Sequence, residues 1–536
     1  MIHRHRVVLL RRAQKLLRRA DRRTVRAALA VVVVAAAAGL VCAAAASNGP
    51  LVTPDGAVYL GTADSLRAGR GLTVPFTTYT DSFDLGLVDD GRIEAPLRTF
   101  PPAFPLTIAA VAEVTSVDGL TAARWTNTLL LAVNVLLIGV VTLRLVGVDR
   151  WPWACGGLVL VLFTQIVFPG MPGMLELHAT VLAEPGMLAA MLTAVLLSAR
   201  VLQRYSTPSV VAAATAAAVA VAFRFAGIAA VAVVLYAVVR SPACSRAIRW
   251  VAVPGVVVAG FAPLAVSMYP SGAEQDPART ILLQPWRPVV AELFGGILGL
   301  VTPVHWPLAV RWSLTAAVLL MAAAALPMIR LRRDHAAAAP IADLLGVLGV
   351  CSMIVLLTSR LLLDRFIPMG GRLLTPLLVV IVPLAVGAAC RIGVRGVALP
   401  AILFAAAVSW TGAQALRAVV PIVPGDRVPA GISSAVDELR AIPRSVVIIT
   451  DAPDGVHLAT GRPAVMVPCR DDYFSGAVDE SYSSDEDTVL DLVRRRRAVV
   501  LLVAPPNPAR RCLDRDDAAR LGLVTRAEWP GGRLFG

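Results

Sequence analysis

Long apolar stretches, each about the length of a bilayer crossing, dominate this chain of 536 residues. A helix needs about 20 apolar residues to cross the hydrocarbon core of a membrane, where its backbone must satisfy its own hydrogen bonds. The stretches supply about eleven crossings, which predicts an all-α polytopic membrane protein. The expected crossings are residues 25–46, 122–146, 152–169, 179–199, 208–223, 225–239, 250–268, 307–329, 341–358, 372–390 and 396–417.

Composition and missing motifs narrow the function classes. The chain is 57% hydrophobic and only 16% charged, whereas soluble domains carry about 25% charged residues. This excludes a soluble globular enzyme, and the large apolar content excludes a disordered chain. The sequence contains no phosphate-binding glycine loop with lysine, no Gly-x-Ser-x-Gly turn, no Cys-x-x-Cys pair and no histidine pair at metal-ligand spacing. ATP-driven transport by this chain alone is therefore not expected.

The arginines predict the orientation of the crossings. The formal net charge is +14, and the strongly basic residues 1–24 directly precede the first apolar stretch. By the positive-inside rule this segment is cytoplasmic. A cleaved signal peptide is the alternative, less favoured because the basic region is long and the apolar run is a full crossing. A nucleic-acid-binding arm is also less favoured than a topology anchor, so we expect no nucleic acid partner. We expect a multi-pass protein of the cell membrane whose C-terminal part is extracytoplasmic.

Three regions follow from this path. Residues 1–24 form a cytoplasmic N-terminus, residues 25–420 a transmembrane domain whose first extracytoplasmic loop is 47–121, and residues 421–536 a small extracytoplasmic α/β domain. Two further apolar segments are too short for ordinary crossings. Residues 104–117 are expected to be a juxtamembrane helix, and residues 289–304 a re-entrant or interfacial segment. The α/β domain rests on strands at 445–450 and 498–504 that alternate with helices at 432–442 and 485–497.

Cys469 and Cys512 are the only cysteines expected outside the membrane and the cytoplasm. Disulfides persist in oxidising compartments, so these two are a candidate disulfide. Two buried free thiols are the alternative.

The first candidate site residues open the first loop. Pro54 suits the start of a helix, and Asp55 and Tyr59 would share one face of it. A carboxylate held there is poised to take a proton from a hydroxyl group. The plainer alternative is a capped loop helix.

A second acid, Glu184, lies near the outer end of the expected crossing 179–199. A carboxylate inside an apolar helix is expensive and indicates function by default. His178 could be its partner, because it lies about one and a half turns earlier. The alternative is a glutamate that reaches out to the interface.

Several arginines are expected on the outer side, against the positive-inside rule. Arg224 lies between two expected crossings, and Asp364, Arg365 and Arg372 precede another. Guanidinium groups can grip phosphate oxygens in a bidentate manner. Interfacial anchoring is the alternative, above all for Arg365.

The order of these motifs resembles the GT-C superfamily of polyprenyl-phosphate-sugar-dependent membrane glycosyltransferases. The similarity is to the branch with protein O-mannosyltransferases and lipid A aminoarabinose transferases and to its actinobacterial relatives, enzymes of the cell envelope. The motifs that carry it are Asp55-Gly-Ala-Val-Tyr59, Phe100-Pro-Pro-Ala-Phe-Pro105, Ala183-Glu184-Pro185, Phe223-Arg224, Gly371-Arg372-Leu-Leu-Thr-Pro376 and the tail segment 446–468.

The resemblance implies transfer of a hexosyl or pentosyl group from a polyprenyl-phosphate donor to a hydroxyl of a glycan, lipid or protein. Asp55 would be the general base, Glu184 would line the cavity, and Arg224 and Arg372 would hold the donor phosphate. No cofactor is firmly implied, and a divalent metal ion is left open because Asp64, Asp89 and Asp90 match the family's paired acids poorly. The alternatives are a transporter or flippase of lipid-linked sugars and an envelope-assembly protein without catalysis. No internal repeat of the transporter kind is visible in the sequence.

Overall fold

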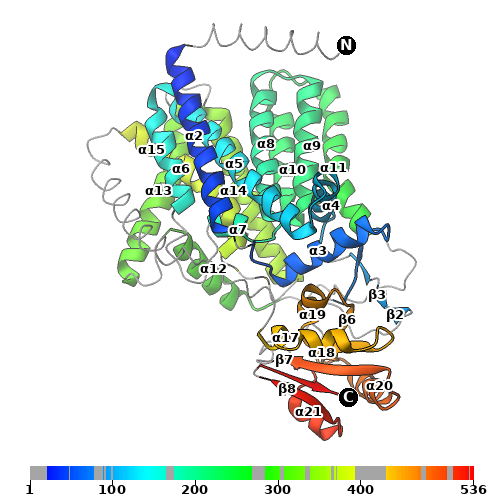
Figure 1. Cartoon of the computed structure of the whole chain (residues 1–536). Coiled ribbons are helices and arrows are strands. Elements are labelled where there is room, and N and C mark those ends of the chain that lie inside the picture. Colours follow the sequence, from blue (N-terminus) through cyan, green and yellow to red (C-terminus); the bar gives the residue numbers. More distant parts are fainter. Residues whose placement is uncertain are drawn as a thin grey trace.

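The computed structural model shows a helical bundle joined to a small α/β domain (Figure 1). It describes residues 21–47, 49–77, 88–89, 92–93, 95–97, 100–163, 174–268, 284–301, 307–331, 338–363, 367, 369, 371–392, 430–471, 478–503, 511–529 and 531–536. The expected crossing 396–417 and the candidate residues Asp364 and Arg365 lie outside the described residues.

The bundle confirms the predicted fold class. Within the described ranges, seven helices are long and apolar enough to cross a membrane. They are α2 (Arg22–Ala45), α5 (Gly119–Val146), α8 (Glu184–Gln203), α11 (Arg246–Met268), α13 (Leu308–Leu331), α14 (Ala339–Thr358) and α15 (Thr375–Ile392). Shorter helices of the same region are α4 (Ala103–Thr115), α6 (Trp151–Phe163), α7 (Met174–Ala179), α9 (Thr207–Phe223), α10 (Ile228–Arg240) and α12 (Trp286–Val301).

Local signals fix several helix ends. Asp118 caps α5 by accepting a hydrogen bond from the backbone N–H of Thr121 at 2.9 Å. Gly147 ends the same helix with a φ of 90°, which glycine adopts without strain. Ser206 caps α9, whose second residue is Pro208. Where the structure describes both ends of an expected crossing, they lie within a few residues of the ends of a helix, and residues 289–301 of the segment expected at 289–304 belong to α12.

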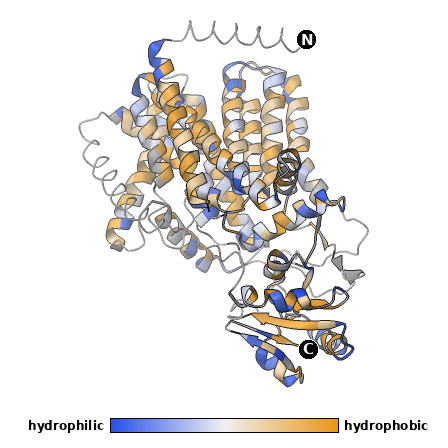
Figure 2. Cartoon of the chain, viewed as in Figure 1, coloured by the Kyte–Doolittle hydropathy of each residue, from blue (hydrophilic) through white to orange (hydrophobic). Residues whose placement is uncertain are grey.

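Small residues let the helices of the bundle approach one another closely. A side chain at Gly139 of α5 would lie 2.4 Å from Val31 of α2. The same holds at Gly260, where an added Cβ would meet Val231 at 2.5 Å. Such small-residue contacts are typical of helix packing in membranes. Figure 2 shows that hydrophobic residues predominate over most of the length of these helices.

The first loop forms a layer of its own at one end of the bundle (Figure 1). It contains α3 (Pro54–Arg67) and α4, and aromatic side chains hold the two helices together. Tyr59 of α3 meets Phe100 and Phe104 edge to face, with ring centroids 5.1 and 5.2 Å apart. Two short antiparallel pairs complete the loop: β1 (Thr73–Val74) with β4 (Ala95–Pro96), and β2 (Val88–Asp89) with β3 (Arg92–Ile93).

The C-terminal region has a five-stranded sheet in the order β6-β5-β7-β9-β8, so the predicted small α/β domain is present. The first three strands are parallel, and β9 joins β7 and β8 in antiparallel pairs. Separate apolar clusters pack helices against the two faces of the sheet. The segment expected as one helix over 432–442 is two short helices. The elements are α17 (Ala430–Ser433), α18 (Val436–Ala441), β5 (Val447–Thr450), α19 (Pro453–Thr460), β6 (Ala464–Met466), α20 (Tyr482–Arg494), β7 (Ala498–Val503), α21 (Arg515–Arg520), β8 (Thr525–Trp529) and β9 (Gly532–Phe535).

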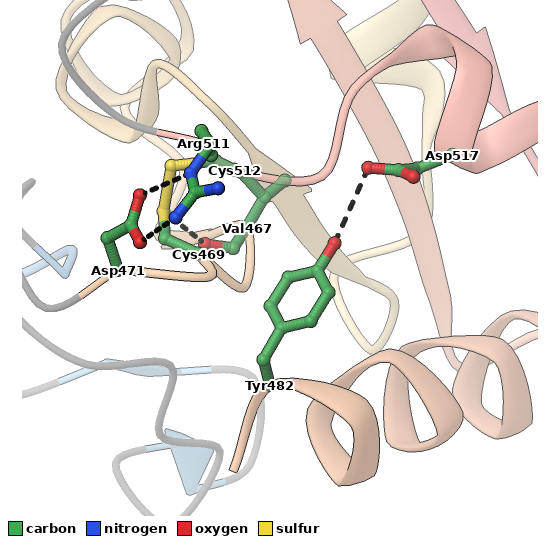
Figure 3. The surroundings of a disulfide bond; sticks show 7 residues. All are labelled: Val467, Cys469, Asp471, Tyr482, Arg511, Cys512 and Asp517. Atoms are coloured by element: carbon green, nitrogen blue, oxygen red, sulfur yellow. Dashed lines mark hydrogen bonds and ion pairs between the residues drawn. A yellow bond between two sulfur atoms is a disulfide. The ribbon is translucent and has the colours of Figure 1, made fainter. Parts of the chain in front are cut away.

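A disulfide joins Cys469 and Cys512, with the sulfur atoms 2.01 Å apart (Figure 3). Beside it, Arg511 donates two hydrogen bonds to the carboxylate of Asp471, at 2.9 and 2.6 Å. Tyr482 donates to Asp517 at 3.4 Å, which ties α20 to α21. The bond and its polar neighbours hold the segment after β6 against the segment before α21.

The α/β domain docks on the first loop through its edge strand. The backbone N–H of Thr77 donates to the carbonyl of Ala464, and the N–H of Met466 donates to the Thr77 hydroxyl at 2.6 Å. The ring of Phe76 lies 5.2 Å from that of His457 in α19. This contact covers an exposed sheet edge and places the domain directly against α3.

Candidate active site

Four charged side chains from distant parts of the chain meet at the end of the bundle where α3 lies. Asp55 comes from the first turn of α3 and Glu184 from the first turn of α8. Arg224 follows α9, and Arg372 lies in a short 3-10 turn before α15. The carboxylates are deeply buried, with side-chain exposures of 8% for Asp55 and 1% for Glu184. We refer to these four residues as the charge cluster.

Each guanidinium of the charge cluster contacts both carboxylates. Arg372 donates to Asp55 Oδ2 at 2.6 Å, and its Nε lies 3.5 Å from Glu184 Oε1. Arg224 Nη1 lies 3.6 Å from Asp55 Oδ2 and 3.3 Å from Glu184 Oε1. The formal charges of the four groups cancel, which is how buried charges are normally accommodated.

The backbone before α3 fixes the position of Asp55. Thr53 caps the helix by accepting from the N–H of Gly56. A side chain at Gly56 would lie 2.8 Å from the carbonyl oxygen of Val181, so glycine permits this close approach. Leu51 forms a parallel bridge with Thr180, so the strand-like start of the loop is tied to the segment that leads to Glu184.

Arg224 occupies a break between two helices. It ends α9 in an extended conformation, with φ −153° and ψ 141°. Glycines allow the packing around it: a Cβ at Gly186 would meet the ring of Phe223 at 2.3 Å, and one at Gly227 would meet the backbone of Ala220 at 2.2 Å. Because the helix breaks at this residue, the Arg224 side chain is directed toward Asp55 and Glu184.

Tyr59 lies one helical turn after Asp55 and supports Arg224. Its hydroxyl oxygen accepts a hydrogen bond from Arg224 Nη1 at 3.3 Å. The side chain is fully buried, and burial raises the pKa of its hydroxyl, partly offset by Arg224. Tyr59 is therefore neutral, and its hydroxyl orients the Arg224 guanidinium.

A hydrogen-bonded turn holds Arg372. Glu292 of α12 accepts from the backbone N–H of Met369 at 3.0 Å and also contacts Arg360 at 3.3 Å. Gly371 precedes Arg372 with a φ of 57°, a conformation that favours glycine. Glu292 was not predicted from the sequence to take part in the site. An acid within the expected interfacial segment was the available signal.

Contrary to our expectation, His178 does not pair with Glu184. Its Nε2 lies 3.0 Å from the side-chain amide of Asn134, and its Nδ1 lies 2.6 Å from the carbonyl of Met174. Both ring nitrogens are thus engaged elsewhere. The expectation assumed a continuous helix through residue 184, whereas α7 ends at Ala179 and α8 begins at Glu184.

Asn127 and Asn134 of α5 are two further site residues that were not predicted from the sequence. Both are buried; Asn127 donates to backbone carbonyls of the segment before α8, and Asn134 donates to the carbonyl of Pro185 in the first turn of α8. Two asparagines spaced seven apart within an expected crossing were the signal that could have found them.

Among the residues that the structure describes, no group of three or more His, Cys, Asp or Glu side chains could hold a metal ion. The side chains of Asp89 and Asp90 lie outside this description. In the charge cluster the carboxylates already face guanidinium groups, a different arrangement from a set of oxygen ligands that converge on a cation.

Comparison with known proteins places the fold. No protein-family model and no curated protein matches the sequence. Among solved structures, ArnT from Cupriavidus metallidurans bound to undecaprenyl phosphate matches with a TM-score of 0.55 and 14% identity, over 94% of this chain and 97% of that one. The apo oligosaccharyltransferase of Archaeoglobus fulgidus matches with a TM-score of 0.51 and 12% identity, over 88% of this chain and 69% of that one.

The first of these neighbours holds undecaprenyl phosphate, the second is an oligosaccharyltransferase, and the fold that they share is the GT-C fold. The chain is a multi-pass membrane protein with the GT-C fold, as the order of its motifs predicted. At identities of 14% and 12% the likeness establishes the fold, and the chemistry has to be argued from the charge cluster.

Proposed function

We propose that the chain transfers a sugar, hexosyl or pentosyl, from a polyprenyl-phosphate donor to an acceptor hydroxyl on the extracytoplasmic side of the membrane. The observation that carries the proposal is the charge cluster, in which two buried carboxylates face two guanidinium groups. The GT-C fold and the undecaprenyl phosphate bound to ArnT support the choice of donor.

Arg224 and Arg372 are the proposed phosphate ligands. Their side chains are 17% and 23% exposed, more than either carboxylate, so they are the more accessible members of the cluster. A phosphate that enters can take over guanidinium N–H groups that now face Asp55 and Glu184. In a largely buried site such charge-assisted hydrogen bonds are strong.

Asp55 is the proposed general base. The acceptor O–H gives its proton to the Asp55 carboxylate while the acceptor oxygen bonds to the anomeric carbon. The bond between that carbon and the phosphate oxygen breaks with its electron pair staying on the phosphate. The lipid phosphate thus changes from a diester with one negative charge to a monoester with two. Arg224 and Arg372 stabilise the added charge.

Glu184 has a different proposed role. It is only 1% exposed and lies between the two arginines, at 3.3 and 3.5 Å. A carboxylate in that place keeps both guanidiniums fixed when the phosphate binds and when it leaves. Prepositioned charges cost little reorganisation during the reaction, which favours catalysis.

The disulfide and the docking of the α/β domain support the extracytoplasmic side. Disulfides persist in oxidising compartments, and the domain that carries Cys469–Cys512 docks on the loop that contains α3. The charge cluster and the disulfide therefore share one side of the bundle. Arginines of the opposite loops, such as Arg200 and Arg204, suit the cytoplasmic face.

An exchange of Asp55 for asparagine tests the proposed chemistry. The variant keeps the side chain's shape but cannot accept the proton, so we expect transfer to fall by roughly 100-fold to 10,000-fold. Purified wild type and Asp55→Asn are reconstituted with lipid extract from a strain that lacks the protein, and formation of glycosylated product is followed by mass spectrometry.

Equal amounts of folded, inserted protein are the control for that comparison. Normal transfer by Asp55→Asn would rule out Asp55 as the base. Movement of a lipid-linked sugar across the bilayer, without any transfer by the wild type, would instead favour the flippase.

A further inference from the structure

We propose that Asn127 and Asn134 of α5 are positioning residues that set the separation of Asp55 and Glu184. This role rests on the proposed function, in which both acids take part in one reaction. Its evidence is a set of hydrogen bonds that lies outside the charge cluster.

Asn127 holds the segment that precedes α8. Its side-chain amide donates to the carbonyl of Thr180 at 2.8 Å and to that of Leu182 at 3.2 Å. The residue is 1% exposed within a helix that is long and apolar enough to cross a membrane. A polar side chain is costly to bury in such a helix, and the two hydrogen bonds that it donates offset this cost.

Asn134 lies two turns further along the same face of α5. Its amide donates to the carbonyl of Pro185 at 2.9 Å and contacts His178 Nε2 at 3.0 Å. Because that amide is a donor, His178 Nε2 accepts, and the ring proton lies on Nδ1, which donates to the carbonyl of Met174. The direction of every bond in this group is therefore determined.

The segment that these asparagines hold, residues 179–185, positions both acids. Glu184 belongs to it directly. Leu51 is bound to it through its N–H, which donates to the carbonyl of Ala179 at 3.0 Å, and through its carbonyl, which accepts from Val181 at 2.9 Å. From Leu51 the chain passes straight to Thr53, the cap of the helix that begins with Pro54 and Asp55. One backbone segment thus sets the distance between the two carboxylates, and α5 anchors it.

Hydrogen–deuterium exchange tests the anchoring without any substrate. In Asn127→Leu and Asn134→Leu the peptides that contain the amides of Leu51 and Val181 should exchange at least about tenfold faster, because their local opening becomes easier. Thr142→Val is the matched control: Thr142 is also buried in α5, but its hydroxyl bonds to Ile138 of its own helix. Unchanged exchange in both Leu variants would overturn the proposal.

Transfer and binding measurements test the functional half. We expect the affinity of Asn127→Leu and Asn134→Leu for undecaprenyl phosphate to lie within about threefold of that of wild type, since both arginines remain. Transfer should fall on the order of 100-fold, as misplacement by about 1 Å can do. The loss should be less than additive with that of Glu184→Gln, because part of the effect of the asparagines passes through that residue. Additive losses would show a role that is independent of Glu184 and would contradict the proposal.

Variants that keep part of the donor set guard against a failure to fold. Asn127→Asp and Asn134→Asp preserve the side chain's shape, and a protonated Asp retains one donor. Their exchange and transfer should lie between those of wild type and the Leu variants. If exchange rises as expected while the wild type transfers no sugar, the anchoring stands and the proposed function fails.

Discussion

Arg372 is the residue on which the phosphate proposal depends most. It makes the shortest contact of the charge cluster, 2.6 Å to Asp55, and is its most exposed member. Because the Arg372 guanidinium is accessible and already paired with a carboxylate, it can pass from that carboxylate to a phosphate without first becoming fully solvated. The donor phosphate would thereby draw Arg372 away from Asp55 as the acceptor approaches.

Removal of this guanidinium should weaken phosphate binding directly. In Arg372→Ala we expect the affinity for undecaprenyl phosphate to fall by about tenfold to 100-fold, as hydrogen bonds to charged groups are worth about 1.5–3 kcal/mol. Binding is measured by titration of the purified protein in detergent. Arg200→Ala, an exposed arginine at the other end of α8, is the control and should bind as wild type. Equal affinities for Arg372→Ala and wild type would contradict the assignment.

Single residues could be predicted from the sequence where they break a rule of membrane composition. Glu184, Arg224 and Arg372 each stood out as a charge in an unexpected place, Asp55 stood out as an acid at a predicted helix start, and the structure brings the four together. Their pairing could not be predicted, because it depends on how four separate helix ends pack. Asn127 was missed because an uncharged side chain within an apolar run does not stand out.

Helix α19 links the α/β domain to the element that carries Asp55. Its His457 packs on Phe76, which is fully buried. Phe76 in turn lies against α3, since a Cβ at Gly61 would meet its ring at 3.0 Å. Burial lowers the pKa of His457 to about 4, against its hydrogen bond with the carbonyl of Arg462, and nearby Arg70 lowers it further. The interface therefore holds a neutral imidazole.

Acid should lower the stability of the contact between α19 and Phe76. Below the ordinary His pKa of about 6.5, the unfolded chain binds a proton that folded His457 excludes, so stability is lost as the pH falls from about 7 toward 4. At pH 5 the loss is at most about 2 kcal/mol. Asp451 has the opposite sign: burial raises its pKa to about 6, so it lowers stability as the pH rises from about 4 to 6.

Comparison of wild type with His457→Phe isolates the histidine contribution. The Phe ring keeps the contact with Phe76 and cannot titrate. Thermal unfolding at pH 7.5 and pH 5 should show a larger drop for wild type than for the variant. An equal drop in both proteins would mean that His457 does not stay neutral in the interface.

Elements could be predicted where length and periodicity decide them. Apolar runs of full crossing length are helices within a few residues of the expected ends, as α2 and α5 show. The break between α7 and α8 was not predicted: Glu184 and Pro185 interrupt the apolar run 179–199, but the hydrogen bonds from α5 to this segment are tertiary contacts that a local pattern does not show. The split of 432–442 into two short helices was missed for the same reason: a local pattern does not show tertiary contacts.

The whole molecule places its charge cluster, first loop and disulfide-bonded domain at one end of the bundle and the start of α2 at the other (Figure 1). Counting apolar runs against arginine loops predicts this polarity, since it needs only the sign of charge along the chain. The same count says nothing about how the α/β domain docks. That contact combines Thr77, which extends the edge of β6, with the packing of Phe76 on His457.

Analysis of the lipids of a strain that lacks the protein tests the central claim, sugar transfer from a lipid phosphate, most directly. We expect a polyprenyl-phosphate sugar to accumulate and one envelope glycan to lose the corresponding residue. Wild type should reverse both changes, and Asp55→Asn, inserted at the same level, should reverse neither. An unchanged lipid and glycan profile in the deletion strain, or full reversal by Asp55→Asn, would contradict the account.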